Sequence, residues 1–497
     1  MTTLDDALTS TSTPATDAAH RSVTLAEHWL DGAAVPARGS RRLLRSSPVD
    51  GSRVGSVTVA DDDEVAAAVT GAAAAFDAWR RTPPADRAAC LTAAAAAVRD
   101  HAEQLGAALT ADTGRLLRTS IESARVAADL LTEAATTGLG PAGRTLAGAP
   151  AALDVVRREP HGVVAVLTPW NDPLPAAAGL LAAALVTGNT VVHKPSERSP
   201  HAGWLLGRLV AEQLPAGVLQ VLAGDGSTGA ALVADARVAL IAHIGSSATG
   251  RAIAAVAGAR GARLLLENGG KDALVVDEDV DPAWAAAQIA LGAFTNTGQL
   301  CTSVERVYLH ERVADAVLDE LVRLADAQTV GDPDDEGTEL GPLVDELQLA
   351  VVAAHVDAAV AAGARCLTGG RRLDRPGAWY PATVLDGCTE EMDVLATETF
   401  GPVAAVRRAP DFDTALAWAG SGRYGLAATV LTGSLEHALR AADRLDVGTV
   451  KVNAVFGGAP GGSADPRRDS GQGAGYGPDL LAAMTRLKAV HLEAPPR

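Results

Sequence analysis

The feature that most constrains the fold of this 497-residue chain is an alternation of short apolar segments with helical ones, which begins near residue 162. In its first part, the apolar segments, separated by single predicted helices, lie at residues 163–168, 190–194, 218–223, 239–245 and 263–267. Nearly continuous apolar strands connected in this way indicate parallel sheets with helices on both faces. A second alternation begins at residues 273–276 and continues to about residue 452. We therefore expect an α/β protein with two doubly wound domains.

Outside this alternation, the chain contains several other kinds of segment. Residues 1–20 are polar and are expected to form a flexible tail, whereas residues 24–59 are typical of short strands and turns and residues 61–139 of Ala-rich helices. An extended segment at 152–158 precedes the alternation, and an apolar strand at 487–492 follows it. We expect these two segments to pair in a small third element. Its exposed strands would either meet another subunit or pack on their own domain.

Composition excludes several classes of partner and site. The 42 Lys and Arg residues stand against 60 Asp and Glu residues, and the resulting net charge of −18 disfavours nucleic acid and anionic membranes as partners. No apolar run approaches the ~20 residues that a membrane-spanning helix needs, and the first residues lack the pattern of a signal peptide. We therefore expect a cytoplasmic protein. Its four cysteines form no Cys-x-x-Cys pair, so no metal site or disulfide framework is predicted.

Cys301 and Glu267 are the strongest candidates for chemistry. Cys301 follows a Gly-containing turn at the end of a predicted helix, where a thiol can be exposed and activated. Glu267 ends an apolar strand, a place where burying a carboxylate is costly. A thiol with a nearby carboxylate suggests covalent catalysis followed by attack of an activated water. The alternative is a buried cysteine with no reactive role.

Three further motifs lie where parallel strands end. Gly224 to Gly229 fits the pattern G-x-G-x-x-G, but the acidic residue that should follow it is missing, so a simple glycine turn is the alternative. Lys194 and Glu197 could bind ribose hydroxyls or form a surface pair. Asn171 offers amide donors to a developing oxyanion, or it caps the helix that follows.

Taken together, these motifs resemble those of the NAD(P)-dependent aldehyde dehydrogenase superfamily, from about residue 24 to the C-terminus. The matching pieces occur in the family's order: Pro169-Trp-Asn, Lys194-Pro-Ser-Glu197, Gly224 to Gly229, Gly245-Ser246, Glu267-Asn-Gly-Gly-Lys271, Phe294 to Cys301, Glu398-Thr-Phe400-Gly-Pro402, Val452-Asn453 and Ser470-Gly-Gln-Gly473. Several independent motifs at compatible spacings are far more specific than any one alone.

The resemblance implies roles for the matching residues. Cys301 would be the nucleophile, Asn171 would stabilise the thiohemiacetal oxyanion, and Glu267 would activate the water that hydrolyses the thioester. The implied cofactor-binding residues are Trp170, Lys194, Ser196, Glu197, Gly226, Gly229, Gly245, Ser246, Gly269, Gln348, Glu398 and Phe400. NAD is favoured over NADP because a carboxylate at Glu197 accepts ribose hydroxyls and repels a 2′-phosphate. NADP remains the alternative.

The resemblance also implies a division into domains. An NAD-binding domain would comprise residues 21–140 and 160–266, and a catalytic domain residues 267–456. Residues 141–159 and 478–497 would form an oligomerisation arm, with a Gly-rich loop at 457–477. The expected partners are a small aldehyde and further copies of the chain, in a homodimer or homotetramer.

The chain departs from the family's pattern near the ligand. Asp172 stands where many members have an aromatic residue, Asn268 replaces the commoner Leu, and His243-Ile244 replaces Phe-Thr. Asp172 would favour a cationic or polyhydroxylated aldehyde, whereas Arg467 and Arg468 could instead recognise a carboxylate or phosphate, as in a semialdehyde.

Three alternative functions stay open. A CoA-acylating enzyme would need CoA to release product, and Glu267 disfavours it because that chemistry excludes water as the acceptor. An esterase activity of the same thiol would be secondary. A non-catalytic relative that acts as a binding or structural protein would be expected to have lost Cys301 or Glu267, and both are present.

Overall fold

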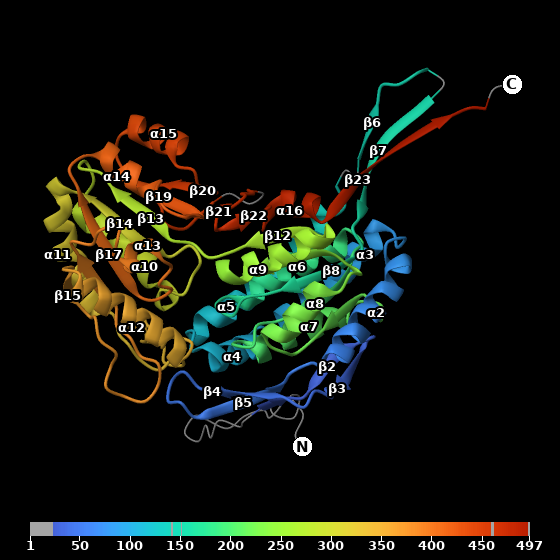
Figure 1. Ribbon diagram of the computed structural model, residues 1–497, viewed down its shortest axis with the longest axis horizontal. Helices are drawn as coiled ribbons and strands as arrows, with labels where there is room; N and C mark the ends of the chain where they lie inside the picture. Colours follow the sequence, from blue (N-terminus) through green and yellow to red (C-terminus); the bar gives the residue numbers. More distant parts are fainter. Residues whose placement is uncertain (1–22, 141–142, 151, 459–461, 496–497) are drawn as a thin grey trace.

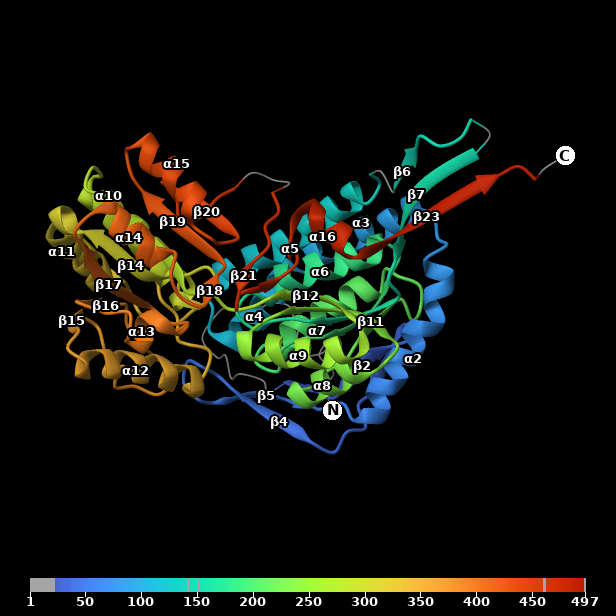
Figure 2. The ribbon, with the colours of Figure 1, turned by 45° about the horizontal axis from the view of Figure 1, so that its top comes forward.

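The computed structural model describes residues 23–140, 143–150, 152–458 and 462–495, so the tail predicted at residues 1–20 lies outside the described residues. Two large mixed sheets with their helices form two lobes, and a narrow three-stranded sheet projects from one end (Figure 1). Viewed from a second direction, the two lobes remain side by side, with short strands of the C-terminal region between them (Figure 2).

The first large sheet has the strand order β22-β12-β11-β8-β9-β10-β2-β3. Its five central strands are parallel, and the edge strands β22, β2 and β3 run antiparallel to their neighbours. The bounds are β2 (Glu27–Leu30), β3 (Ala33–Pro36), β8 (Val163–Leu167), β9 (Thr190–Lys194), β10 (Leu219–Val221), β11 (Val238–Ile244), β12 (Arg263–Glu267) and β22 (Gly471–Gln472).

Successive residues of these strands pack into two different cores. Val163 and Ala165 of β8 belong to a buried cluster with α2, α8 and α9, whereas Val164 and Val166 belong to one with α3 to α7. The helices are α2 (Asp62–Trp79), α3 (Pro84–Asp100), α4 (Ala102–Thr113), α5 (Leu117–Thr137), α6 (Pro173–Val186), α7 (Pro200–Ala211), α8 (Gly226–Ala234) and α9 (Ser247–Arg260). Both faces of the sheet are therefore covered, which explains why its central strands are apolar at most positions.

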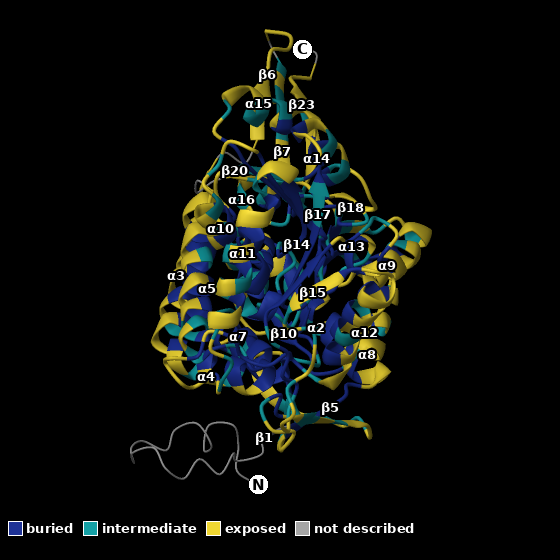
Figure 3. Ribbon diagram, turned by 90° about the vertical axis from the view of Figure 1, so that its left-hand side faces the viewer, coloured by how far each residue is buried: buried dark blue, intermediate teal, exposed yellow. Residues whose placement is uncertain are grey.

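The second large sheet has the order β15-β16-β17-β14-β13-β19-β20 and is parallel except for β15. Its strands are β13 (Asp272–Val276), β14 (Val304–His310), β15 (Arg365–Thr368), β16 (Thr383–Asp386), β17 (Val403–Ala409), β19 (Ala427–Leu431) and β20 (Thr449–Val452). Its helices are α10 (Pro282–Phe294), η1 (Thr295–Gly298), α11 (Glu311–Ala327), α12 (Glu346–Ala361), α13 (Asp393–Ala396), α14 (Phe412–Ala419) and α15 (Leu435–Arg444). Buried residues concentrate on its central strands and exposed ones on the outer helices (Figure 3).

The smaller elements link and extend these lobes. β1 (Val23–Leu25), β4 (Arg42–Ser46) and β5 (Arg53–Thr58) form one small sheet, and β18 (Tyr424–Gly425) pairs with β21 (Arg467–Arg468). Because β21 pairs beside the second lobe and β22 pairs with β12 of the first, this segment bridges the two. α16 (Gly477–Ala483) follows it.

The projecting sheet consists of β6 (Gly143–Leu146), β7 (Ala152–Pro160) and β23 (Thr485–Glu493). β7 and β23 pair antiparallel along their whole length, from Ala152 opposite Glu493 to Pro160 opposite Thr485. This is the pairing that the sequence predicts for the third element. Among the described residues, no helix is long and apolar enough to cross a membrane.

Candidate active site

A cavity of about 880 Å³ lies at the carboxyl ends of the parallel strands of the first sheet. Segments after β8, β9 and β11 form one wall, and loops of the second lobe that carry Cys301 and Glu398 form another. It is lined by every predicted catalytic and cofactor-binding residue except Glu267: Trp170, Asn171, Lys194, Ser196, Glu197, Gly226, Gly229, Gly245, Ser246, Gly269, Cys301, Gln348, Glu398 and Phe400. Ligands of open α/β sheets bind at this position.

Cys301 lies in the turn between α10 and β14, on a backbone of unusual conformation. Asn296 and Thr297 have φ angles of 52° and 55°, which non-glycine residues adopt rarely and mainly at functional sites. Asn171 Nδ2 donates to the carbonyl oxygen of Gln299 at 2.9 Å, which joins the Asn171 loop to the Cys301 turn. Burial raises the pKa of the Cys301 thiol to about 12, and the carboxylates of Asp272 and Glu267 add to this effect. The thiol is therefore protonated at neutral pH in the free chain.

Glu267 ends β12, but its carboxyl group does not line the cavity. It lies against Gly475, where a Cβ atom would be only 2.3 Å from Cγ and Oε1 of Glu267. Oε1 is buried and has no hydrogen-bond partner among the described residues. Burial raises the pKa of Glu267 to about 8, a value suited to a base that works near neutral pH.

The Lys194 end of the cavity has the polar groups that a ribose needs. Lys194 Nζ donates to the carbonyl oxygens of Pro195 at 2.8 Å and Gly224 at 3.2 Å, and it lies 3.5 Å from Oε2 of Glu197. Burial lowers the pKa of Lys194, while the partial exposure of Glu197 leaves its carboxylate accessible from the cavity. Together these groups offer donors and acceptors to ribose hydroxyls.

Two helix N-termini border the middle of the cavity. Gly226 begins α8, and an ideal Cβ on it would meet no atom within 4 Å, so open space lies in front of this helix end. Ser246 caps α9 by accepting a hydrogen bond from the backbone N–H of Thr249. Helix N-termini attract phosphate groups through free N–H groups and the helix dipole, so this region suits a pyrophosphate.

The opposite end of the cavity contains a buried carboxylate. Gly270 N–H donates to Oε1 of Glu398 at 2.9 Å, and a Cβ on Gly269 would lie 2.3 Å from Oε2. Burial raises the pKa of Glu398 to about 8, with a further contribution from the nearby Glu305 carboxylate. With ribose donors at one end, helix termini in the middle and a carboxylate at the other, the residues fit a dinucleotide.

Phe400 and Trp170 form an aromatic corner beside Glu398. Phe400 has a φ of 54°, and its ring lies edge-on to Trp170 with centroids 5.3 Å apart. Gln348 Nε2 donates to the carbonyl oxygens of Thr399 at 3.0 Å and Phe400 at 3.1 Å. These contacts hold the Glu398–Phe400 segment in place.

Some lining residues were not identified from the sequence. Arg198 lies with its guanidinium carbon 5.5 Å from the Trp170 ring centroid and pairs with Asp345 at 3.2 Å. The only sequence signal for Arg198 was its position two residues after Ser196. His243 and Asn268, noted above as departures from the family, also line the cavity, and both have buried polar atoms without hydrogen-bond partners among the described residues.

Arg467 and Arg468 are occupied by contacts within the chain. Arg467 Nη1 donates to the carbonyl oxygen of Asp465 at 2.7 Å, and Arg468 Nη2 donates to that of Asp446 at 2.8 Å. Both also lie within 4 Å of the Asp446 carboxylate. Neither lines the cavity, so the idea that they recognise a substrate carboxylate receives no support from their positions.

Known proteins resemble this chain over nearly its whole length. The model of the family described as "Aldehyde dehydrogenase family" matches residues 35–490. A betaine aldehyde dehydrogenase 2 from Rhizobium meliloti is 34% identical, covering 94% of this chain and 97% of the relative. A 3,6-anhydro-alpha-L-galactose dehydrogenase from Streptomyces coelicolor is 36% identical over 90% of this chain and 92% of the relative. The crystal structure of an NAD-dependent aldehyde dehydrogenase from Sinorhizobium meliloti superimposes with a TM-score of 0.92 at 32% identity, covering 96% of this chain and 97% of that one.

Proposed function

The chain belongs to the aldehyde dehydrogenase family, and on that premise we propose that it oxidises an aldehyde to the free carboxylic acid with NAD, using Cys301 as nucleophile and Glu267 as the base that activates water. The observation that carries this proposal is the single cavity that contains Cys301 and Asn171 together with Lys194, Glu197 and Glu398.

The proposed chemistry begins at Cys301. The Cys301 thiol gives its proton to water, its sulfur adds to the aldehyde carbon, and the resulting oxyanion is stabilised by the Asn171 side-chain amide and the backbone N–H of Cys301. One N–H of Asn171 already donates to Gln299, which orients the amide and leaves its second N–H for the oxyanion. When bound, NAD supplies the hydride acceptor that oxidises the carbon.

Glu267 completes the reaction by hydrolysis. It takes a proton from a water molecule whose oxygen adds to the acyl carbon, and the Cys301 sulfur leaves as the carboxylic acid is released. Because the Glu267 carboxyl lies against Gly475 in the structure, we propose that it turns toward the thioester for this step. A water-activating base also favours a hydrolytic enzyme over a CoA-acylating one.

NAD would lie along the cavity with its adenosine ribose at Lys194 and Glu197. Its pyrophosphate would lie near Ser246 and the start of α8, and its nicotinamide ribose at Glu398 beside Phe400. The NAD-dependent structural relative supports this cofactor. The carboxylate of Glu197 disfavours the 2′-phosphate of NADP by charge repulsion.

The projecting sheet is proposed to be an oligomerisation arm. Its exposed leucines, which a monomer would leave in water, are Leu146, Leu153, Leu487 and Leu492. A second copy that covers them would remove this apolar surface from water. Light scattering coupled to size exclusion should show a dimer or tetramer for the intact chain, and a Leu487→Lys variant should shift it toward the monomer.

The proposed activity is tested with a panel of aldehydes, assayed with NAD and NADP in parallel. We expect NADH formation with the intact chain and none with Cys301→Ala. Cys366→Ala is the matched control, because this exposed cysteine lies on β15 and does not line the cavity. Oxidation that continues in Cys301→Ala would contradict the assigned nucleophile.

A further inference from the structure

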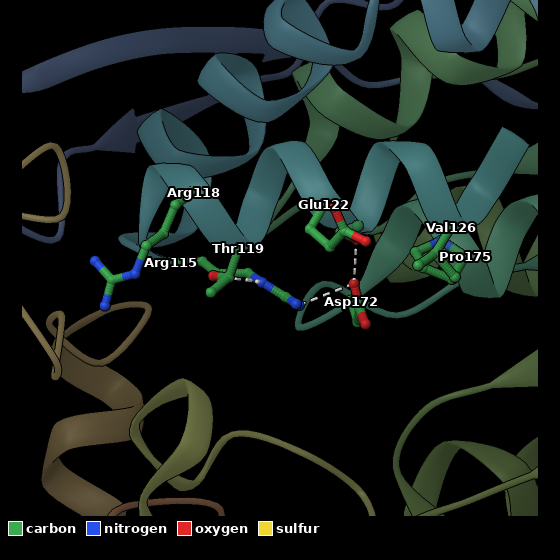
Figure 4. A pocket seen from close by; sticks show the side chains of 8 residues that line it. Arg115, Arg118, Thr119, Glu122, Val126, Asp172 and Pro175 are labelled. Atoms are coloured by element: carbon green, nitrogen blue, oxygen red, sulfur yellow. Dashed lines mark hydrogen bonds and ion pairs between the residues drawn. The ribbon is translucent and has the colours of Figure 1, made fainter. Parts of the chain in front are cut away.

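A second pocket, of about 500 Å³, lies between α5 and the segment that carries Asp172 (Figure 4). Helix α5 and the residues just before it supply Arg115, Thr119, Ser123 and Val126. Asp172 and Pro175 face them from the segment after β8. No aromatic residue is among the described residues that line this pocket.

Asp172 is held in this pocket by a network that also reaches the reactive cavity. Its Oδ1 accepts a hydrogen bond from Ser123 Oγ at 2.5 Å and pairs with Arg115 Nη1 at 2.8 Å. Arg115 Nη1 also donates to the carbonyl oxygen of Asn171 at 3.3 Å, and its Nε donates to Thr119 Oγ1 at 3.3 Å. Because Asn171 lines the cavity of Cys301, the network touches a residue of that cavity through the Asn171 carbonyl oxygen.

The network keeps two polar groups available for a ligand. Among the described residues, no hydrogen bond or ion pair engages Oδ2 of Asp172 or Nη2 of Arg115. One can accept and the other can donate, a combination that matches a hydroxyl group. The hydroxyls of Thr119 and Ser123 lie in the same wall.

The same groups disfavour other aldehydes. Arg115 neutralises Asp172, so a cationic aldehyde gains little from the carboxylate, and no aromatic face is present to bind a quaternary ammonium. A substrate carboxylate would also gain little, because the two arginines that line the pocket, Arg115 and Arg118, are balanced by the carboxylates of Asp172 and Glu122. An alkyl chain would remove water from the ion pair without replacing its hydrogen bonds.

Resting on the proposed function, we propose that this pocket selects a neutral, hydroxylated aldehyde, one of whose hydroxyls donates to Asp172 and accepts from Arg115. These residues then determine specificity without taking part in the bond changes at Cys301.

The test compares kcat/KM for glyceraldehyde and pentanal, which have equal numbers of non-hydrogen atoms. A site built to bind a hydroxyl discriminates strongly against an analogue that lacks it, so we expect glyceraldehyde to be preferred by at least about tenfold. Asp172→Asn should lower that ratio by about tenfold, since it removes a charged hydrogen-bond partner. Ser123→Ala should lower the ratio by a smaller factor, and this variant provides the test if Asp172→Asn does not fold. Asp129→Asn, on the exposed side of α5, is the matched control and should leave the ratio unchanged.

The outcomes separate this inference from the proposed function. Failure to oxidise any aldehyde would overturn the proposed function itself. Oxidation without preference for glyceraldehyde, or a ratio unaffected by Asp172→Asn and Ser123→Ala, would overturn the inference alone. A preference for betaine aldehyde or succinic semialdehyde over glyceraldehyde would also overturn it, in favour of a cationic or anionic substrate.

Discussion

The two ends of the site are built in different ways. At the cofactor end, Lys194, Glu197, Ser246 and the glycines of α8 lie at strand ends within short motifs, and the sheet topology brings them together. At the aldehyde end, Asp172 meets Arg115 and Ser123 from α5 and the loop before it, about fifty residues away in the chain. The comparison teaches that sheet topology brings together the motifs proposed to bind the cofactor, whereas the specificity that we propose depends on side chains from segments far apart in the chain.

The largest effect is expected from breaking the buried ion pair that supports the cofactor end. Lys271 pairs with Glu305, whose two carboxylate oxygens accept from the backbone N–H groups of Thr399 at 2.7 Å and Phe400 at 2.8 Å. Lys271→Met would leave a buried carboxylate unpaired and should cost about 3–5 kcal/mol of unfolding free energy. Denaturant unfolding measures this loss, and it should be accompanied by a higher KM for NAD.

The matched control is the exposed pair of Arg99 and Asp129. Arg99→Met should change the free energy of unfolding by less than about 1 kcal/mol. If Lys271→Met and Arg99→Met lowered the free energy of unfolding by equal amounts, the cofactor end would not depend on the Lys271–Glu305 pair.

A glycine at the cofactor end should be the next most sensitive position. Gly269→Ala would place a Cβ 2.3 Å from Oε2 of Glu398 and so displace that carboxylate. We expect the KM for NAD to rise by about tenfold, which corresponds to the loss of one hydrogen bond. Gly258→Ala, on α9 with open space around its Cβ, should leave the KM unchanged. An unchanged KM for NAD in Gly269→Ala would show that Glu398 does not take part in cofactor binding.

The contrast between the two ends also explains what could be predicted from the sequence. The helix at 173–186 and the strands at 190–194 and 263–267 have the predicted bounds, because apolar periodicity and Pro173 define them locally. The predicted cavity residues of the first lobe lie after the carboxyl ends of its parallel strands, where ligands of such sheets bind.

Other features could not be read from the sequence because they depend on long-range contacts or on rotamers. The pairing of Asp172 with Arg115 needs the packing of α5 on α6, which no local pattern specifies. The position of the Glu267 carboxyl against Gly475 depends on a side-chain rotamer and on a glycine far along the chain. The bridge made by β21 and β22 arises from a Gly-rich stretch that was expected to be a loop.

The pH dependence tests the chemistry that lies between the two ends. With the pKa of Glu267 raised to about 8, the base is mostly protonated at pH 7 and mostly ionised at pH 9. Steady-state turnover should therefore rise about tenfold between these pH values if hydrolysis limits the rate. Glu267→Gln should remove this rise while an initial burst of NADH remains. A profile that is the same in both proteins would assign water activation to another group.

The smallest effect is expected for cofactor choice. Glu197 is 41% exposed at its side chain, so its repulsion of a 2′-phosphate is partly screened by water. Glu197→Gln should raise the ratio of kcat/KM with NADP to that with NAD only a few-fold, as expected for an exposed charge pair. Glu212→Gln, a partly exposed carboxylate at the C-terminal end of α7 that does not line the cavity, should leave the ratio as it was. A larger shift toward NADP in the control than in Glu197→Gln would place the ribose elsewhere.

The most direct test of the account is to trap the acyl group on the protein. Glu267→Gln is incubated with NAD and an aldehyde that the unaltered protein oxidises, and the masses of its peptides are measured by mass spectrometry. The account predicts an added acyl mass on the peptide that contains Cys301, formed in step with the burst of NADH. An acyl group on another residue, or a burst of NADH without any added mass at Cys301, would contradict it.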